Sequence, residues 1–279
     1  ARRQRQMCIR DSHRPWLLCA AQGVFPQSIQ RHRSGLSPLR RVHAGRVSPM
    51  ETSAAFMNTH LENLDWPMIE AALMNDGFAL LPRLLTRQTC RQLAALYADE
   101  SHFRSRIVME RYAFGRGEYQ YFRYPLPALV DSLRSHLYAR LAPVANRWHA
   151  ALKMNQRFPD THVEFKALCH QAGQCRPTPL MLRYRQNDYT CLHQDLYGEQ
   201  VFPFQAVFLL DQPGVDFEGG EFVLTHTGSS KAARAEVVPL EQGQALIFAV
   251  NSRPARSARG FCTVSVRHGA VSYTHLRAH

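Results

Sequence analysis

The sequence lacks any uninterrupted apolar run of about 18 residues, the length that a membrane-spanning helix needs. It also lacks internal repeats at periods of about 20 to 50 residues, which argues against solenoid and other repeat architectures. The composition is 45% hydrophobic, 20% charged and 10% aromatic, so the chain can bury a sizeable core. A membrane-spanning helix and a collagen-like, coiled-coil or wholly disordered chain are therefore excluded.

The sequence lacks CxxC motifs, since no two of its seven cysteines have this spacing. Five remain when Cys8 and Cys19 of the basic N-terminal flank are set aside: Cys90, Cys169, Cys175, Cys191 and Cys262. This odd number without paired spacing is typical of reduced thiols and predicts a cytoplasmic protein. Cys169, His170 and Cys175 could begin a zinc site, but no second pair completes it.

Acidic residues are almost absent from both flanks. Residues 1–50 hold ten Arg and one acid, Asp11, whereas residues 271–279 hold Arg277 and no acid. Residues 51–270 hold 23 basic and 21 acidic residues, a net charge of +2, so most of the net charge of +12 belongs to the flanks. A nearly neutral body gives little support to binding through a broad basic surface.

The flanks resemble DNA translated by accident. Arg2–Ser12 (RRQRQMCIRDS) and Val271–Leu276 (VSYTHL) resemble the two reading directions of one transposon-end sequencing adapter. We therefore expect residues 1–12 and 271–279 to lie outside the fold. The natural chain is expected to continue beyond Ala270.

The Arg-rich, aperiodic residues 13–49 are expected to be disordered, or to be upstream sequence that was translated in frame. The natural start would then be Met50 or Met57. Residues 13–49 contain no convincing secretory signal.

Helical patterns dominate residues 50–170. Asp65 and Thr86 can each cap a helix, and Pro143 should divide the longest pattern into two helices. The expected helices cover residues 65–75, 86–97 and 128–153, with a short strand over 78–85.

The pattern changes after about Gln171, where short β-type runs follow one another, separated by Gly, Pro, Asp or Ser clusters. The runs cover residues 180–184, 204–210, 221–225, 235–240, 245–250 and 261–267. This spacing predicts an antiparallel barrel or sandwich over residues 171–270. The fold class is therefore α+β, a β-domain supported by a helical first half.

The motif His193-Gln194-Asp195 carries the most specific chemistry. On an extended strand, residues i and i+2 face the same side, so an imidazole and a carboxylate converge. His268, which follows the last β-type run, can supply a third ligand, whereas His226 comes too early in the chain. Two His and one carboxylate leave three metal positions open, as in non-haem Fe(II) oxygenases. A lone His-x-Asp also occurs by chance on protein surfaces.

Four ordered landmarks make residues 180–269 resemble the prolyl-hydroxylase-like Fe(II)/2-oxoglutarate dioxygenases. A strand bearing Tyr184 leads into the His-x-Asp motif, and FEGGEF (217–222), PLEQGQALIF (239–248) and His268 follow. From about Leu64, phrases such as GRGEYQYFRYPLP, RPTPLMLRY, CLHQDLYGE and GGEFVLT are similar to a narrower bacterial group. That group has a proposed role in oxidative demethylation of damaged DNA.

The resemblance implies a double-stranded β-helix (jelly-roll or cupin-like) in which His193, Asp195 and His268 hold Fe(II). The cosubstrates would be 2-oxoglutarate and O2, which yield succinate and CO2 as a substrate C–H bond is hydroxylated. A hydroxylated N-methyl group loses formaldehyde, which restores the base. Tyr184 and Tyr189 are candidates to bind 2-oxoglutarate, although Tyr184 could equally be a core residue.

One part of the family pattern is missing. The family places an Arg or Lys for the distal carboxylate of 2-oxoglutarate roughly ten residues after the distal His. That position is Ala278, and Arg277 beside it lies in the adapter-like tail. Arg267 should face the opposite side of its strand. We therefore expect a missing anchor, a truncated final barrel strand with an exposed edge, and weak turnover.

The substrate stays open at this stage. Arginines interleave with aromatic residues over 103–124, a mixture that suits stacking and phosphate contact with nucleic acid. Core aromatics with solvated arginines explain the same pattern equally well. The alternatives to an alkylated base are a prolyl-type protein side chain or a small molecule. A non-catalytic cupin-like binding module, or an inactive fragment, is the hypothesis from another class.

Overall fold

The computed structural model describes residues 16–20, 49–196, 198–228, 232–258 and 260–274. The helices are α1 (Pro49–Glu62), α2 (Trp66–Asp76), α3 (Arg87–Leu96), α4 (Ala128–Ala151) and α5 (His162–Gln171). Two 3-10 turns cover Glu100–His102 and Met109–Tyr112. None of these helices is long and apolar enough to cross a membrane.

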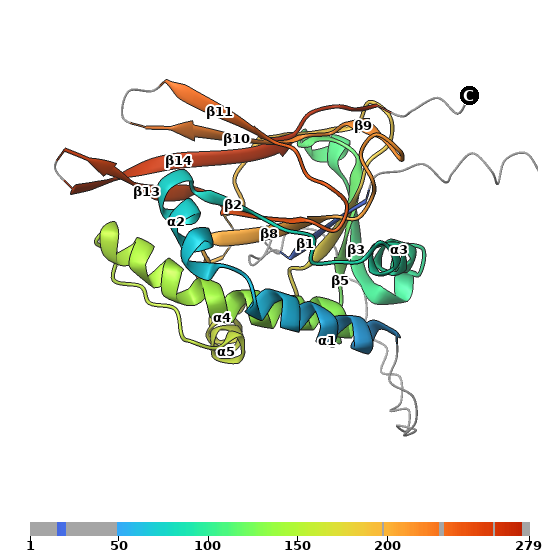
Figure 1. The fold of residues 1–279 in the computed structure, drawn as a ribbon, viewed down its shortest axis with the longest axis horizontal. Helices are drawn as coiled ribbons and strands as arrows, with labels where there is room; N and C mark the ends of the chain where they lie inside the picture. Colours follow the sequence, from blue (N-terminus) through green and yellow to red (C-terminus); the bar gives the residue numbers. More distant parts are fainter. Residues whose placement is uncertain (1–15, 21–48, 197, 229–231, 259, 275–279) are drawn as a thin grey trace, which may run out of the picture.

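The larger of two main antiparallel sheets has seven strands, in the order β2-β12-β8-β1-β6-β5-β3. They are β1 (Trp16–Ala20), β2 (Phe78–Leu81), β3 (Phe103–Val108), β5 (Glu118–Phe122), β6 (Leu180–Arg183), β8 (Phe204–Leu209) and β12 (Ala245–Ala249). Helices α1, α4 and α5 lie below this sheet in Figure 1. The helical half and the β half thus share one sheet, which differs from the expected division at residue 170.

The second sheet has the order β11-β10-β14-β7-β4, with β13 paired to β14. Its strands are β4 (Gly115–Arg116), β7 (Tyr189–His193), β10 (Phe222–Thr227), β11 (Ala233–Val238), β13 (Ser252–Ser257) and β14 (Gly260–Ala270). It faces the larger sheet across the middle of the molecule (Figure 1). A small ribbon of β9 (Glu218–Gly219) and β15 (Tyr273–Thr274) joins one end.

Local sequence signals account for most of these elements. All six expected β-type runs form strands. Asp65 caps α2 by accepting a hydrogen bond from the Met68 amide at 3.1 Å, and Thr86 caps α3 in the same way. Gly77 ends α2 in the left-handed conformation that glycine tolerates.

Pro143 does not divide the long helix, contrary to expectation, because α4 is continuous from Ala128 to Ala151. A proline inside a helix costs about 3 kcal/mol through a lost hydrogen bond and a clash with the preceding turn. Leu141, Val144 and Trp148 on both sides of it are at most 3% exposed. Burial of these side chains offsets the cost and keeps one helix.

Two terminal segments enter the fold, contrary to expectation. Trp16–Ala20 forms β1, which pairs antiparallel with both β6 and β8. Five consecutive apolar residues can fill a central strand position, and Leu18 is fully buried. Tyr273 is 1% exposed and stacks on Tyr184 at 4.5 Å between ring centres. In the larger sheet, β1 lies between β6 and β8 and pairs with both. The exposed edge expected from a truncated final barrel strand stays a prediction.

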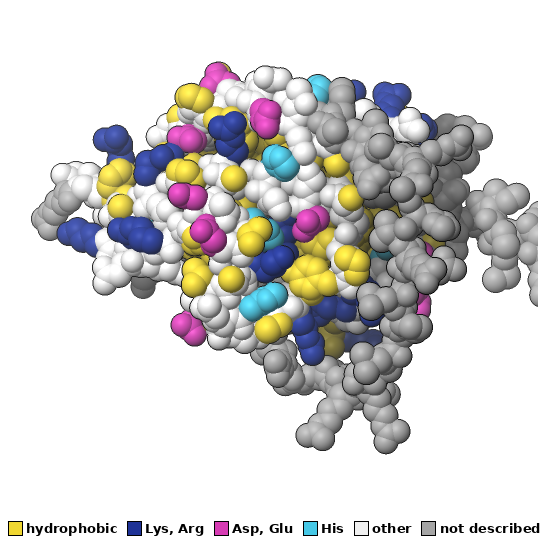
Figure 2. Space-filling model, turned by 90° about the horizontal axis from the view of Figure 1, so that it is seen from below, with side chains coloured by type: hydrophobic (Ala, Val, Ile, Leu, Met, Phe, Trp, Pro, Cys, Tyr) yellow, Lys and Arg dark blue, Asp and Glu magenta, His cyan; other side chains and the backbone are white. Residues whose placement is uncertain are grey.

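The outer face that carries the helices shows no single-sign surface. Basic and acidic side chains are both scattered over the part of this face that Figure 2 colours. This agrees with the nearly balanced charge of residues 51–270.

His162 of α5 gives a prediction about stability. Burial, and then the charges of Arg134 and Lys166, lower its pKa to about 3. The unfolded chain takes up a proton below about pH 6.5, while the folded chain does not, so the free energy of unfolding falls as the pH drops. Between pH 7 and 5.5, His162 should remove about 1 kcal/mol, as measured by urea denaturation.

A His162→Phe variant should lack this part of the pH dependence, because it suits the aromatic neighbours Tyr138 and Phe165 without titrating. His170→Gln, an exposed change on the same helix, is the control and should retain it. Equal pH dependence of wild type and His162→Phe would contradict the prediction.

Candidate metal centre

The structure brings the three expected ligands together between the two sheets. His193 ends β7, Asp195 follows two residues later, and His268 lies near the end of β14. The Nε2 atoms of His193 and His268 lie 3.7 Å and 3.4 Å from the carboxylate oxygens of Asp195. One ligand atom from each residue lies within 4.8 Å of the others, and no second group of this kind occurs among the described residues.

A bulge in β7 aims His193 at this cluster. His268 pairs with His193 and Ala270 with Thr190, so two steps along β14 match three along β7. The extra residue of a bulge bends its strand and turns a side chain to the other face. His193 and Thr190 therefore both line the same cavity, although they are three residues apart.

The hydrogen bonds and charges prepare these groups to bind a cation. Nδ1 of His193 lies 2.8 Å from the Cys191 carbonyl oxygen and donates to it, which leaves the Nε2 lone pair for a metal. Burial, and then the neighbouring His268, lower the pKa of His193. Burial alone would raise the pKa of Asp195, but hydrogen bonds from His268 and Gln205 and the two nearby imidazoles lower it. Metal ligands must be deprotonated, and these shifts favour that form.

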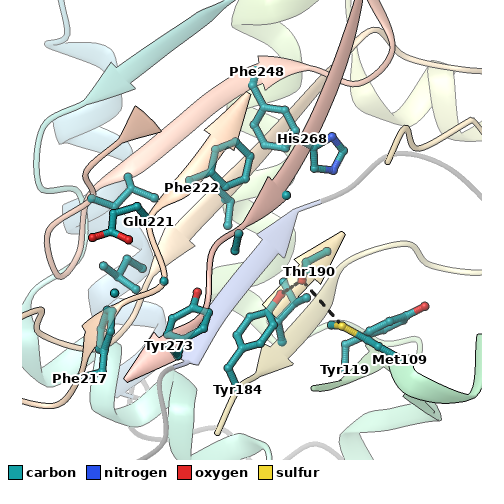
Figure 3. Close-up of a pocket in the computed structure, with 18 of the residues that line it drawn as sticks. Met109, Tyr119, Tyr184, Thr190, Phe217, Glu221, Phe222, Phe248, His268 and Tyr273 are labelled. Atoms are coloured by element: carbon teal, nitrogen blue, oxygen red, sulfur yellow. Dashed lines mark hydrogen bonds between the residues drawn. The ribbon is translucent and has the colours of Figure 1, made fainter. Parts of the chain in front are cut away.

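Aromatic packing fixes His268. Its ring lies 4.7 Å from that of Phe248 and 6.0 Å from that of Phe222, and both rings lie to one side of it in Figure 3. His268 is 5% exposed, whereas Arg267 beside it is exposed, as strand alternation predicts. The imidazole is thus held between the two sheets by packing against aromatic rings.

Gln194, the middle residue of the motif, points away from the cluster and anchors it. Its Nε2 donates to the carbonyl oxygens of Asn251 and Val266 at 2.7 Å and 2.8 Å. It also lies 3.1 Å from Ser265 Oγ. The side chain therefore ties the segment that carries Asp195 to β14, which carries His268.

Replacing Gln194 with leucine should weaken metal binding about tenfold or more, because ligands that lose their outer supports lose affinity. Isothermal titration calorimetry with Fe(II) under anaerobic conditions measures this change in affinity. Gln171→Leu makes the same chemical change on the exposed end of α5 and should leave the affinity unaltered. If Gln194→Leu bound Fe(II) with wild-type affinity, the hydrogen bonds of Gln194 would not be needed to position Asp195.

A cavity of about 440 Å³ opens beside the three ligands. Alternate residues of two strands of the larger sheet face it: Leu180 and Leu182 from β6, and Gln205, Val207 and Leu209 from β8. Phe217, Glu221 and Tyr273 close another side (Figure 3). The cavity is large enough for a small organic cosubstrate.

Tyr184 lines this cavity, but Tyr189 does not. The Tyr184 hydroxyl lies 2.6 Å from Thr190 Oγ1, and Thr190 in turn contacts the Met109 sulfur at 3.8 Å (Figure 3). Tyr189 is 38% exposed and pairs with Arg116 on β4. The structure therefore does not bring Tyr189 to the cavity, because the bulge turns Thr190 inward in its place.

His226 also stays outside the cluster. It lies on β10 opposite Val266, while Leu224 pairs with His268. Its Nδ1 accepts a hydrogen bond from Arg253 Nε at 3.4 Å. The preference for His268 as the third ligand agrees with this placement.

Sequence reasoning missed Thr190, Gln194 and Gln205. Gln205 is 6% exposed and donates a hydrogen bond to Asp195. A usable signal existed for it, since it is a polar residue inside the apolar run Phe204–Leu209, at the alternation that faces the cavity. Thr190 and Gln194 had no such signal.

Apart from the three ligands, the described lining of the cavity carries charge only on two acids. Among its described lining residues there is no Lys or Arg, whereas Glu218 and Glu221 are present. The expected position of the carboxylate anchor, Ala278, lies outside the described residues, as does Arg277. The hydroxyl groups among the described lining residues belong to Tyr119, Tyr121, Tyr184, Thr190 and Tyr273.

Several known proteins are similar to this chain. Two proteins of Mycobacterium tuberculosis, named "Uncharacterized protein MT2286" (strain CDC 1551 / Oshkosh) and "Uncharacterized protein Rv2227" (strain ATCC 25618 / H37Rv), are each 43% identical over 148 residues. The match covers 53% of this chain and 64% of each relative, so the chain spans less than two thirds of their length.

Two solved structures also match. A Pseudomonas putida prolyl-4-hydroxylase aligns with a TM-score of 0.41 and 12% identity, over 76% of this chain and 100% of its own. A 2OG-Fe(II) oxygenase family oxidoreductase from Burkholderia pseudomallei aligns with a TM-score of 0.39 and 13% identity, over 76% of this chain and 91% of its own.

A family model matches residues 117–277, which include all three ligands of the cluster. Its description is an oxygenase that catalyses oxidative methylation of damaged DNA. The match covers more than half of the sequence, and the chain belongs to this family, Oxygenase-NA.

Proposed function

We propose that this protein is an Fe(II)- and 2-oxoglutarate-dependent dioxygenase that oxidises N-methyl groups on bases of damaged DNA. The observation that carries the proposal is the cluster of His193, Asp195 and His268 at the wall of a cavity. Two imidazoles and one carboxylate are the donor set of non-haem Fe(II) oxygenases, which keep three positions open for reactants.

The fold that we propose for this chemistry is the double-stranded β-helix. Two antiparallel sheets that face each other, with the reactive residues between them, are consistent with such a jelly roll. The ligands come from β14 and from the end of β7, which are paired neighbours in the smaller sheet.

The donor set fits iron. Ligand atoms that share one ion at bond lengths of about 2.1 Å lie about 3 to 4 Å apart, as the separations of both imidazoles from Asp195 do. Iron with 2-oxoglutarate and O2 would supply the oxidation: one oxygen atom enters the substrate C–H bond and the other enters succinate, with loss of CO2. The resulting N-hydroxymethyl group releases formaldehyde, so the outcome on a methylated base is demethylation.

The chain's own residues would orient the reactants. The Cys191 carbonyl oxygen holds the tautomer of His193, and Gln205 holds the carboxylate of Asp195. Phe222 and Phe248 exclude water around His268. Such outer contacts tune a metal site as well as position it.

The fit to 2-oxoglutarate is partial. The cavity accommodates it, and Tyr184 and Thr190 can hydrogen-bond its distal carboxylate. A hydroxyl donor gives a weaker contact than a bidentate arginine, and the described lining has no cation. We therefore expect low affinity for 2-oxoglutarate, and turnover should be assayed at high cosubstrate concentration.

An aromatic pair at the cavity supports a base as the substrate. Phe114 lines the cavity, is 37% exposed, and stacks with Tyr112 at 6.4 Å and 26°. Arg111 and Arg116 nearby are exposed. Base stacking on aromatic rings and phosphate contacts from arginine are the means by which proteins hold single-stranded nucleic acid.

The lack of a lining cation also favours a second candidate, a metal-binding module without turnover. A prolyl-type protein hydroxylase and a small-molecule hydroxylase remain the other enzyme hypotheses. The free thiols of the five described cysteines are in keeping with the proposed cytoplasmic location.

The test is an assay with Fe(II), excess 2-oxoglutarate and a single-stranded oligonucleotide that bears one N-methylated base. We expect succinate and formaldehyde in equal amounts, and neither product with Asp195→Ala. Succinate release with peptides but not with the oligonucleotide would move the proposal to a protein hydroxylase. Tight Fe(II) binding without succinate from any substrate would favour the non-catalytic module.

A further inference from the structure

A second hollow lies where α4 and α5 meet the segment before β6. Its lining includes Arg134 of α4, Lys166 of α5 and Arg176, together with Tyr124 and Thr178. Its volume is about 20 Å³, against about 440 Å³ for the catalytic cavity. A hollow of this size does not admit a second organic substrate.

Arg134 is buried there without an opposite charge, since it is only 8% exposed. Its Nη1 and Nη2 lie 3.3 Å from the Tyr124 hydroxyl and 3.4 Å from Thr178 Oγ1, while Nε donates to nothing in the described part of the chain. None of the ion pairs among described residues includes Arg134. Buried charges are normally paired, because an unpaired one destabilises the fold.

Further positive charge surrounds Arg134. Lys166 Nζ lies 5.9 Å from the ring centre of Tyr124, whose hydroxyl Arg134 contacts. Arg104 donates to the Pro177 carbonyl oxygen beside Thr178, and burial together with the charge of Arg176 lowers the pKa of Arg104.

Among the described residues that line the hollow, there is no acid to balance this charge. Its other lining residues are Phe165, Cys169, His170, Gln174 and Gln200. Burial, and then the positive charges of Arg134 and Lys166, lower the pKa of the nearby His162, which agrees with an excess of positive charge here. The hollow therefore has donors and charge for an anion and no group that would repel one.

We propose that this hollow, the Arg134 site, binds a phosphate dianion. Three cations without an acid match a doubly charged oxyanion better than a singly charged carboxylate. A guanidinium presents paired N–H donors to phosphate oxygens, and the hydroxyls of Tyr124 and Thr178 are already within reach of it. Inorganic phosphate and the terminal phosphate of a nucleic acid strand share this chemistry, and the proposal does not depend on the metal centre.

The first test is thermal unfolding of the full chain with increasing inorganic phosphate at constant ionic strength, with chloride as the reference salt. A ligand that binds only the folded state raises the melting temperature as its concentration rises. We expect this rise for the wild type. Arg134→Met should melt no lower than wild type without phosphate, because it removes an unpaired buried charge, and its melting temperature should not respond to phosphate.

Lys166→Gln tests the site without touching the buried arginine. We expect its phosphate affinity to fall about tenfold, since one of the charges is lost. Lys153→Gln is the matched control, because it removes the same charge at an exposed position that does not line the hollow. Its response should equal that of the wild type.

Two oligonucleotides of one sequence, with and without a 5′-phosphate, distinguish free phosphate from the terminal phosphate of a strand as the ligand. Tighter binding of the phosphorylated strand, lost in Lys166→Gln, assigns the site to a strand end. Equal binding of both strands, with the response to inorganic phosphate retained, assigns it to free phosphate. The proposal is overturned if the melting temperature of the wild type does not respond to phosphate. It is also overturned if Arg134→Met and Lys166→Gln respond to phosphate as strongly as the wild type does.

Discussion

Replacing His268 with alanine should weaken Fe(II) binding by more than about 100-fold, since loss of a direct ligand exceeds the effect of losing its outer supports. The same change should abolish any 2-oxoglutarate turnover. Anaerobic titration with Fe(II) measures the affinity directly and does not require activity. His193→Ala and Asp195→Ala should behave alike, because all three groups face one point.

His226→Ala is the matched control for this loss. His226 is also buried, and it lies on β10 beside the strand that carries His268. It contacts Arg253 and does not face the cluster. Its variant should bind Fe(II) with wild-type affinity, and a comparable loss in both variants would show that the effect comes from the fold and not from a lost ligand.

Gly269→Ala is expected to have the second large effect. A Cβ atom on Gly269 would lie 2.6 Å from the Thr190 carbonyl oxygen and 3.2 Å from backbone atoms of Cys191. These neighbours are backbone, so β7 and β14 must move apart at the bulge, and His193 moves with them. Overpacking of this kind costs about 1 to 3 kcal/mol. We expect that loss of stability in urea denaturation, together with a clear drop in Fe(II) affinity.

Gly228→Ala provides the comparison, because a Cβ atom there would meet no atom within 4 Å. Both variants add one methyl group to a glycine of the smaller sheet or its loops. If Gly269→Ala retained wild-type stability and Fe(II) affinity, the close approach of β7 and β14 would not control the cluster.

The ligands could be predicted because they depend on short-range patterns. The i, i+2 spacing of His193 and Asp195 and the β-type runs are local, and His268 follows the last run. The alternation of Leu180, Leu182 and Tyr184 toward one cavity is also a local property of strands. Such features need no knowledge of which strands become neighbours.

The details that depend on strand pairing could not be predicted. The bulge in β7 arises from its register with β14, so Tyr189 was expected where Thr190 stands. The same register gives Gln194 its carbonyl partners across the sheet. Pro143 was expected to break a helix because the sequence shows the local free-energy cost of a proline. The sequence does not show the burial of the neighbouring side chains, which offsets that cost.

Strand β1 has a further consequence for handling the protein. Its five residues join β6 to β8, and removing them would leave two open strand edges in the middle of the larger sheet. Open edges recruit strands from other molecules. A protease cut that releases this segment would therefore be followed by aggregation, and tags are better attached at a position that leaves Trp16–Ala20 undisturbed.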